Sequence, residues 1–434
     1  MNHSETLKYL HQKGNEVQMM HLGLHRTFAM MRALGNPQHQ YPSLHIAGTN
    51  GKGSVAAMCE SILRHAGYAT GLYTSPHLMR VEERIRVGGR QVGPRSFARL
   101  ATRVRETEVE LLEKRILDRP LTTFEFLTCC AFHHFAQQKV DIAVMEVGLG
   151  GKLDATNVIY PQVAVITGVA LDHQNYLGNT LTQIAGEKAG IIKRHVPVIS
   201  GADTSAPRRV ILRRAKQVDA PVTECWKDSK IRIRREWRGR YTFDLKTPRR
   251  QYKDLRLSLA GEYQTRNAAL AIMAIETLKN FPVKAGDIRR GLAGTRWPGR
   301  LDEYNSRRRT LLDGAHNPEG SRLLRDFLVH CGETELHFVF GAMRDKNIRE
   351  MGGCLFPLAT SIHLTPVANT RAAAPGQVAE LFRRFRSRMV LHSGMREALN
   401  AAWRNCSPSG LVVVTGSLYL VGNLLPMIQE NCGK

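Results

Sequence analysis

Between residues 40 and 200, short apolar runs alternate with segments whose apolar residues recur at helical spacing. The run 41–48 predicts a strand that ends in a glycine turn, and an amphipathic helix follows it up to Gly67. Because the runs 141–147 and 163–169 are largely apolar and contain several β-branched residues, they are typical of buried parallel strands. Further elements are predicted as strands over 69–74 and 196–200 and as helices over 180–193 and 262–278.

A second stretch, residues 301–434, repeats this alternation. Its predicted strands are 309–313, 336–340, 361–366, 389–392 and 411–415. Strands that alternate with helices indicate βαβ units and a parallel sheet. The segment 294–300 (GTRWPGR) has no periodicity and contains Gly, Trp and Pro, so it is the predicted linker. The patterns together predict an α/β protein with one domain over 1–296 and a Rossmann-like α/β domain over 301–434.

The segment 207–258 differs from both stretches. Its short, charged, alternating runs, such as KIRIRREW and RYTFDLK, predict antiparallel hairpins that form a small β-rich part of the first domain. Residues 207–256 hold 17 Lys and Arg against 6 Asp and Glu, a net charge of +11. Two interpretations of this charge stay open, a solvated basic face and a surface that steers anionic substrates.

The whole chain of 434 residues has 62 Lys and Arg against 38 Asp and Glu, a formal net charge of +24. This excess points to nucleic acid, a membrane surface or anionic small molecules as partners. Hydrophobic residues make up 43%, which excludes wholesale disorder, and no apolar run is long enough for a transmembrane helix. The N-terminal residues resemble neither a signal peptide nor a transit peptide. Because the eight cysteines lack C-x-x-C spacing, we expect a reducing, cytoplasmic location without a disulfide framework or a thiolate zinc site.

The segment 48–54 (GTNGKGS) stands between a predicted strand and a predicted helix. Its glycines let successive backbone N–H groups face one point, where the N-terminus of the helix adds partial positive charge. Lys52 would reach the terminal phosphates of a nucleotide, and the Ser54 hydroxyl would approach Mg²⁺. The loop departs from G-x-x-x-x-G-K-[ST] in its first spacing and in the insertion of Gly53. Its position between strand and helix favours phosphate binding over a plain glycine turn.

Polar residues also follow other predicted parallel strands. Ser75 comes after the second strand, Glu146 after the run IAVM, and Asp172 and His173 after VITGVA. Ligands bind at the carboxyl ends of parallel strands, and Mg²⁺ takes oxygen ligands, so these residues are predicted to hold Mg²⁺ opposite the phosphates. By contrast, the pairs Cys129–Cys130 and His133–His134 lie in an apolar helical pattern, and we expect core or partly exposed residues there rather than a metal site.

With these motifs the sequence resembles the folylpolyglutamate synthase/dihydrofolate synthase family of Mur-type ATP-dependent ligases. The likeness is an ordered series along nearly the whole chain. Its members are LGLHR (22–26), LGNPQHQYPSLHIAGTNGKGS (34–54), GLYTSPHL (71–78), FEF (124–126), MEVGLGGKLDATN (145–157), ALDHQNYLGNTL (170–181), EKAGIIK (187–193), YQTRNAALA (263–271), RWPGRL (296–301), LDGAHNPEG (312–320) and VTGSLY (414–419). The family usually has Arg where this chain has Lys152.

The resemblance implies a role for each matching position. The implied ATP contacts are Gly48, Thr49, Asn50, Gly51, Lys52, Gly53, Ser54, Asn267, Arg300, Asp313 and His316, and they would place ATP between the two domains. The implied ligands of one or two Mg²⁺ ions are Ser75, Glu146 and His173. The implied catalytic residues are Lys52, His173 and Lys188, the last as a carbamate. The implied contacts to pteroate or folate are Thr123, Phe124, Glu125, Leu153, Asp154 and Ala155, with the loop 22–26 helping to cover them.

The implied activity is ATP-dependent addition of L-glutamate to folates through an acyl phosphate. Dihydropteroate and tetrahydrofolate both fit as acceptors, and small molecules, with no nucleic acid or membrane, are the expected partners of a monomer. A nucleic-acid-stimulated P-loop ATPase is the alternative suggested by the charge, although the chain lacks an apolar strand that ends in Asp-Glu. Another Mur-type amino-acid ligase is the second alternative. A peptidoglycan enzyme should carry an additional sugar-nucleotide domain, and only about 40 residues precede the strand before the glycine loop.

Overall fold

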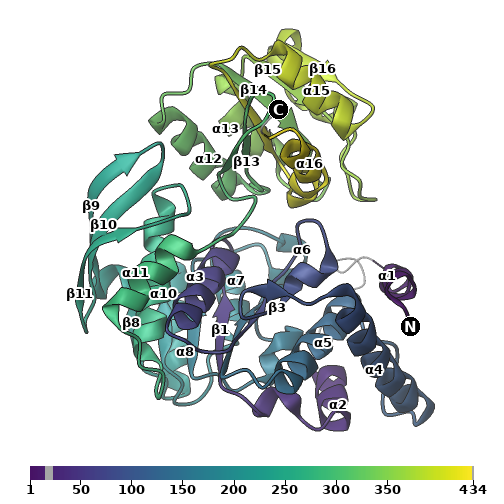
Figure 1. Ribbon diagram of the computed structural model, residues 1–434, viewed down its shortest axis with the longest axis vertical. Helices are drawn as coiled ribbons and strands as arrows, with labels where there is room; N and C mark the ends of the chain where they lie inside the picture. The colour runs from purple at the N-terminus through teal and green to yellow at the C-terminus, as the bar shows by residue number, and fades with distance from the viewer. Residues whose placement is uncertain (15–22, 433–434) are drawn as a thin grey trace. The chain divides into compact units, whose positions relative to one another are not determined.

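The computed structural model describes residues 1–14 and 23–432. The chain divides into two compact units (Figure 1). The first comprises Met1–Arg232, Asp244–Leu255 and Arg266–Thr295, and the second comprises Ile233–Phe243, Arg256–Thr265 and Arg296–Lys434. The main division, between Thr295 and Arg296, falls within the segment 294–300. Within the described ranges, no helix combines the length and apolar character needed to cross a membrane.

The first unit is built on an eight-stranded sheet in the order β4-β3-β2-β5-β1-β6-β7-β8. The strands are β1 (Ser43–Ala47), β2 (Thr70–Tyr73), β3 (Ile85–Val87), β4 (Arg90–Gln91), β5 (Ile142–Glu146), β6 (Val163–Ile166), β7 (Val198–Ser200) and β8 (Val222–Glu224). All neighbours from β2 to β8 pair in parallel, whereas β3 and β4 add an antiparallel edge. The predicted parallel sheet is therefore confirmed.

Helices cover both faces of this sheet. The helices that begin before residue 296 are α1 (His3–Gln12), α2 (His25–Ala33), α3 (Lys52–His65), α4 (Pro94–Glu113), α5 (Thr123–Gln137), α6 (Gln174–Leu177), α7 (Leu181–Ala189), α8 (Ser205–Gln217), α9 (Cys225–Asp228), α10 (Tyr263–Thr277) and α11 (Ala285–Gly294). The crossover from β1 through α3 to β2 and the crossover from β6 through α7 to β7 run in opposite directions along the sheet. Right-handed crossovers of opposite direction lie on opposite faces, and ligands bind where the direction reverses. That reversal lies at the end of β1.

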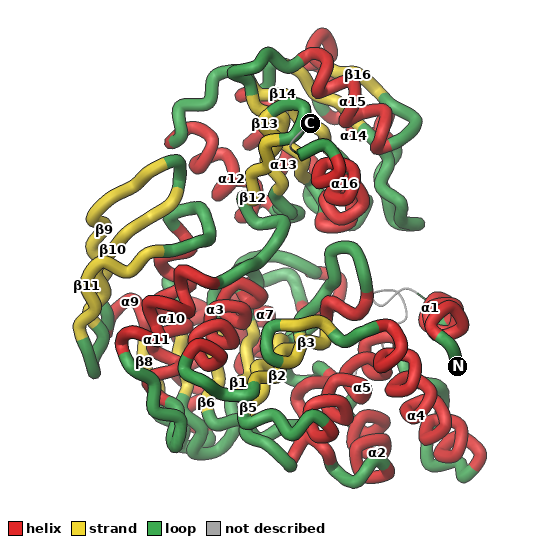
Figure 2. Tube along the Cα trace, in the orientation of Figure 1, coloured by secondary structure: helices red, strands yellow, loops and turns green. Residues whose placement is uncertain are grey.

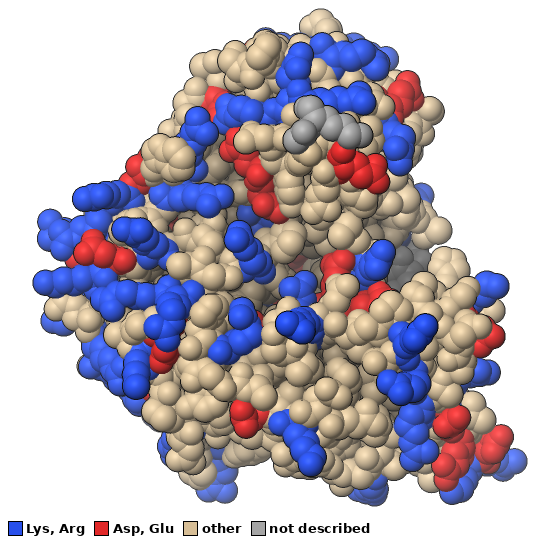
Figure 3. Space-filling view, viewed as in Figure 1, with Lys and Arg blue, Asp and Glu red and all other residues tan. Residues whose placement is uncertain are grey.

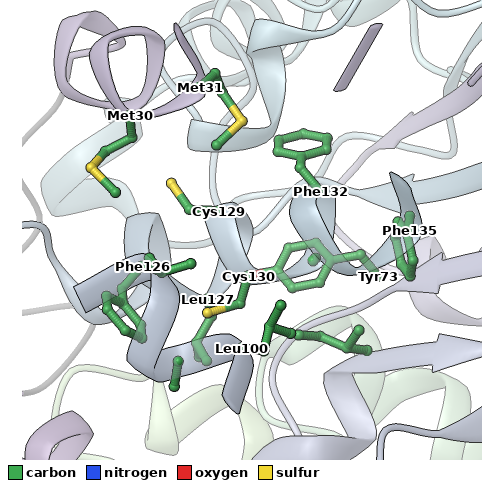
Figure 4. Close-up of a cluster of buried hydrophobic side chains, with 14 of the residues drawn as sticks. Met30, Met31, Tyr73, Leu100, Phe126, Leu127, Cys129, Cys130, Phe132 and Phe135 are labelled. Atoms are coloured by element: carbon green, nitrogen blue, oxygen red, sulfur yellow. The ribbon is translucent and has the colours of Figure 1, made fainter. Parts of the chain in front are cut away.

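A core of large apolar side chains lies between α5 and the sheet (Figure 4). Phe126, Phe132 and Phe135 of α5 are fully buried there, with Tyr73 of β2. Cys129 and Cys130 are buried in the same cluster as free thiols, so the expected core position of this pair is confirmed. Because α5 is apolar on nearly every side, it must be buried between layers of the fold to keep these side chains from water.

The prediction of hairpins throughout 207–258 is wrong for its first third. Residues 205–217 form α8, in which Pro207, Ile211 and Ala215 are buried at a spacing of four residues. The basic residues between them occupy the solvent side of the helix, and they mask this apolar stripe in the sequence. The edge strand β8 then joins the large sheet in parallel with β7.

The rest of the segment forms the three-stranded sheet β11-β10-β9, seen as a separate group of strands in Figure 2. Its strands are β9 (Lys230–Trp237), β10 (Arg240–Lys246) and β11 (Gln251–Arg256). Short connections join β9 to β10 and β10 to β11, as only antiparallel neighbours allow. The predicted hairpins are thus present here, and Lys and Arg side chains gather over this sheet in Figure 3.

The second unit contains a six-stranded sheet in the order β12-β13-β17-β14-β15-β16. The strands are β12 (Asp302–Asn305), β13 (Arg309–Leu312), β14 (Leu336–Phe340), β15 (Ser361–Leu364), β16 (Met389–Leu391) and β17 (Leu411–Thr415). The helices are α12 (Pro318–His330), α13 (Ile348–Leu355), α14 (Pro375–Leu381), α15 (Met395–Asn405) and α16 (Leu418–Glu430). Only β12 pairs antiparallel, so the predicted Rossmann-like α/β arrangement is confirmed.

Candidate active site

The loop after β1 curls at two glycines. Gly48 has a φ of 151° and Gly51 a φ of 84°, both in the region that favours glycine. A Cβ atom on Gly48 would lie 1.9 Å from Thr167 Oγ1, and one on Gly51 would lie 2.6 Å from Asn267 Oδ1. Neither position has room for a side chain. Since α3 begins at Lys52, its first N–H groups open onto this loop, a geometry suited to phosphate.

The other loop residues are fixed to the end of β6 or enter α3. The Thr49 N–H donates to Gly168 O over 2.8 Å, and Thr167 Oγ1 donates to Asn50 O over 2.6 Å. Gly53 and Ser54 lie in the first turn of α3, where Ser54 is buried. Sequence reasoning missed Thr167, although it directly follows the apolar run 163–166. Its position at the end of a buried parallel strand, the feature it shares with Glu146, is the signal that identifies it.

Lys52 and Lys188 converge on one carbonyl group. Lys188 Nζ, which α7 carries into the interior, donates to Gly48 O over 2.8 Å. Lys52 Nζ donates to the same oxygen over 3.1 Å and to Thr49 O over 3.2 Å. Burial, and then the charge of Lys52, lower the pKa of Lys188 to about 7. A large share of the Lys188 amine is therefore uncharged near neutral pH, and an uncharged amine is the form that can add CO₂.

The predicted Mg²⁺ ligands lie at the ends of neighbouring strands. Glu146 is the buried last residue of β5, and its Oε2 accepts the Ser75 N–H beyond β2 over 3.1 Å. His173 precedes α6 with a φ of 49°, and its Nε2 lies 3.9 Å from Asp172 Oδ1. A serine and a carboxylate held together at the carboxyl ends of neighbouring strands offer oxygen ligands that fit a hard cation such as Mg²⁺. The imidazole of His173 is a softer ligand than an oxygen atom, so the match to Mg²⁺ depends mainly on Glu146 and Ser75.

Of the residues predicted to contact pteroate or folate, three open α5. Thr123 is buried, and its Oγ1 donates to Gly14 O over 3.2 Å. Phe124 is only partly buried, and its ring centroid lies 6.0 Å from that of Tyr73. Its ring also closes over Gly148, because a Cβ there would approach Phe124 Cζ to 2.5 Å. Phe124 is the member of this group that a ligand ring could reach.

Glu125 is engaged inside the protein. Its Oε1 pairs with Arg26 Nη2 over 2.9 Å, and its Oε2 accepts the Thr122 N–H over 2.8 Å as part of a capping box. Arg26 is fully buried, and both His25 and Arg26 lie in α2 rather than in a covering loop. Leu22, the first residue of the predicted loop, lies outside the described residues. These contacts support a structural role for Glu125.

Replacing Arg26 with methionine should therefore lower the free energy of unfolding by about 3–5 kcal/mol, because Glu125 would keep a buried charge without its partner. Chemical denaturation measures this difference. The matched control is Lys114→Ala, which removes an exposed helical pair with Glu110 and should cost less than about 1 kcal/mol. Equal losses in the two variants would contradict the structural role.

The remaining three, Leu153, Asp154 and Ala155, follow β5, and Ala155 begins the 3₁₀ helix Ala155–Val158. Asp154 Oδ2 accepts the N–H groups of Gly148 and Leu149, each over 3.0 Å, and Oδ1 accepts the Thr156 N–H over 3.0 Å. Burial raises the pKa of Asp154, and these hydrogen bonds oppose that rise. The carboxylate therefore holds the loop in shape, and Leu153, which is partly exposed, is the more accessible residue.

Three predicted nucleotide contacts gather in the second unit around the turn after β13. Asp313 is buried, and its two oxygens accept the N–H groups of Leu301 and Ala315, each over 2.9 Å. Burial raises its pKa and Arg300 lowers it. Arg300 also lies close to Gly314, where a Cβ would come within 2.5 Å of Nη1. His316 Nδ1 is 2.9 Å from Gly314 O. The structure thus brings Arg300, Asp313 and His316 together, and their binding to a nucleotide stays a prediction.

Known proteins show the same architecture. Residues 46–275 match the Mur ligase middle domain, and residues 299–418 match the glutamate ligase domain of Mur ligases. The chain is 36% identical over 426 residues to folylpolyglutamate synthase of Lacticaseibacillus casei, covering 97% of each chain. It is 34% identical over 407 residues to dihydrofolate synthase/folylpolyglutamate synthase of Bacillus subtilis, covering 93% of this chain and 94% of the relative. It superposes on Mycobacterium tuberculosis folylpolyglutamate synthase complexed with ADP with a TM-score of 0.91, at 32% identity and 98% coverage of both chains. The chain therefore belongs to the folylpolyglutamate synthase/dihydrofolate synthase family of ATP-dependent Mur-type ligases.

Proposed function

We propose that this ligase attaches L-glutamate to a folate, or to dihydropteroate, by forming an amide bond at the expense of ATP. The observation that carries the proposal is the loop 48–54, with its two positive-φ glycines and the two lysines that meet at Gly48 O. Relatives that align over nearly the whole chain are folylpolyglutamate synthases and dihydrofolate synthases, which supports this choice of substrates.

In the proposed reaction, a carboxylate oxygen of the acceptor attacks the γ-phosphorus of ATP, and ADP leaves. The α-amine of glutamate then attacks the acyl phosphate, so that the C–N bond forms, phosphate leaves and the amine releases a proton. The loop N–H groups and Lys52 would hold the phosphates and offset their developing charge. Glu146 and Ser75, with His173, would hold Mg²⁺, which supplies further neutralisation of phosphate charge when bound. Arg300, Asp313 and His316 are the proposed nucleotide contacts of the second unit.

Two parallel assays test the function and separate its substrates. ATP and L-glutamate are supplied with either dihydropteroate or tetrahydrofolate, and ADP and the glutamylated product are measured. We expect ADP release that requires both glutamate and at least one of the two acceptors. Product from both acceptors would identify a bifunctional enzyme. ADP release that is independent of any acceptor and of glutamate would contradict the proposal.

The net charge of +24 is the reason to test one alternative function, that of a nucleic-acid-stimulated ATPase. The family match does not favour it. If DNA or RNA stimulated ATP hydrolysis while folate and glutamate did not, the rival would replace the ligase. The expected result is no stimulation by nucleic acid.

A further inference from the structure

Three side chains of the second unit bring together the donor atoms that zinc prefers. Glu335 immediately precedes β14, His337 lies within it, and Cys406 directly follows α15. A carboxylate oxygen, an imidazole nitrogen and the thiol sulfur lie within 4.8 Å of one another. Glutamate, histidine and cysteine are ordinary zinc ligands. None of the three belongs to the proposed ligase site. The spacing of the cysteines did not reveal this group, because Cys406 is far from the other two in sequence.

The distances between the three donor atoms are close to those between the ligands of a zinc ion. Glu335 Oε1 lies 3.0 Å from His337 Nε2. In a tetrahedral site with metal–ligand distances of about 2.0–2.2 Å, an oxygen and a nitrogen ligand stand roughly 3.4 Å apart, and a sulfur stands roughly 3.6 Å from the nitrogen. The carboxylate and the imidazole already have nearly this spacing, and the sulfur of Cys406 needs a shift of at most about 1.2 Å. The side chain of Glu335 is 31% exposed, which leaves a path for a cation and for a water ligand.

Both ligands on the β14 side are held in orientation. Glu335 also accepts the Ser407 N–H over 2.8 Å, which ties it to the chain beside Cys406. On the other side of the imidazole, His337 Nδ1 lies 2.7 Å from Ser361 Oγ. Metal-binding histidines commonly use their second ring nitrogen in such a hydrogen bond, which fixes the ring and the tautomer.

That hydrogen bond begins a buried polar row along one face of the sheet. Ser361 Oγ lies 2.9 Å from His363 Nε2, and His363 Nδ1 lies 3.0 Å from His392 Nε2. His392 Nδ1 is 3.4 Å from Glu397 Oε1, an ion-pair distance. His337 and Ser361 are paired across β14 and β15, and His363 is two residues further along, so these side chains share a face.

Four hydrogen bonds link Glu335 to His392 through His337, Ser361 and His363, and three imidazoles with one hydrogen each and one hydroxyl supply four hydrogens. When these hydrogens point towards Glu335, His392 Nδ1 is left as a buried nitrogen without a hydrogen-bond partner, 3.4 Å from Glu397 Oε1. A cation between His337 Nε2 and Glu335 would turn every hydrogen the other way, so that the Nδ1–H of His392 would face the Glu397 carboxylate. A cation at the Glu335 end would therefore satisfy the row at both ends.

We propose that Glu335, His337 and Cys406 bind a divalent cation of the zinc type, with water as the fourth ligand. On binding, the Cys406 thiol releases its proton to solvent and the sulfur bonds to the metal. The site would join the start of β14 to the end of α15.

Zinc binding to the full-length protein tests this proposal without recourse to ligase activity. The protein is stripped with a chelator, and Zn²⁺ is titrated in competition with a chromogenic zinc indicator. We expect one zinc per chain, no displacement by excess Mg²⁺, and at least about a tenfold loss of affinity in His337→Gln and Cys406→Ser. The matched control Cys354→Ser, at a partly buried cysteine in α13, should bind zinc like the parent.

Cobalt provides a signature of the sulfur ligand. Co²⁺ bound to the parent protein and to Cys354→Ser should show a thiolate-to-cobalt charge-transfer band that Cys406→Ser lacks. Glu335→Gln keeps the size of the side chain and an oxygen that can accept the Ser407 N–H, so it serves if another variant fails to fold. Absence of zinc binding by the parent would overturn the proposal and leave an added proton to complete the row. Equal zinc affinity in the parent and in correctly folded Glu335→Gln and Cys406→Ser would also overturn it.

Discussion

Lys52→Ala is expected to lower ligase turnover by about 10³-fold. Lys52 is the first residue of α3, and its Nζ lies against the carbonyls of Gly48 and Thr49, inside the loop proposed to hold the phosphates. Its removal would leave the charge on the transferred phosphoryl group without this cation. ADP release in the presence of glutamate and the preferred acceptor measures the effect.

The matched control for this experiment is Lys114→Ala. Lys114 is exposed at the end of α4, and its only described ion pair is with the exposed Glu110. The control should retain parental turnover, and thermal unfolding should show that both variants are folded. Near-normal turnover in Lys52→Ala would mean that the loop 48–54 does not hold the reacting phosphate.

Lys188→Ala should reduce turnover by about 10²–10³-fold if the Lys188 carbamate acts as an anion in the site. Short-chain carboxylic acids should restore part of the loss, because they can place a carboxylate in the space that the side chain vacates. Since the pKa of Lys188 is lowered to about 7, the uncharged amine becomes scarcer as the pH falls below 7. CO₂-dependent activation of the parent enzyme should therefore weaken on the acid side and persist on the alkaline side.

A second, partly buried lysine controls for the loss of a lysine with a lowered pKa. Lys193 Nζ donates to Asn157 O over 3.1 Å, and burial also lowers its pKa. Lys193→Ala should show no response to carboxylic acids. Full activity of Lys188→Ala without any added acid would exclude the carbamate.

Local sequence pattern predicted most strands of both sheets because each is a short apolar run in a βαβ order. Where the apolar stripe was narrow, the prediction failed. In α8 three small or apolar residues face the sheet, and the arginines around them suggested a charged hairpin instead. The strand β12 was missed for a related reason: its four residues, DEYN, are polar and lie at the sheet edge. Only pairing with β13 defines it, and such pairing is a tertiary property.

The candidate site, like the fold, was predicted only in part. The glycine loop and the strand-end residues could be identified because parallel strands bring their carboxyl ends to one edge. What the sequence did not indicate was which polar side chains are already engaged in the protein. Asp154 accepts N–H groups of its own loop, and Glu125 pairs with Arg26 of α2, a contact that depends on how distant segments meet. Their side-chain chemistry is compatible with ligand binding, yet their described partners are internal.

The strand β9 lies at the edge of its three-stranded sheet, and seven of its eight residues are exposed, including Trp237 at 70%. An exposed edge offers unpaired backbone groups to a strand of another molecule, which is a route to aggregation. Along β9 these groups are flanked by Lys230, Arg232, Arg234 and Arg235. Two such edges would bring like charges face to face, so we expect these basic side chains, visible in Figure 3, to oppose the joining of sheets between copies of the chain.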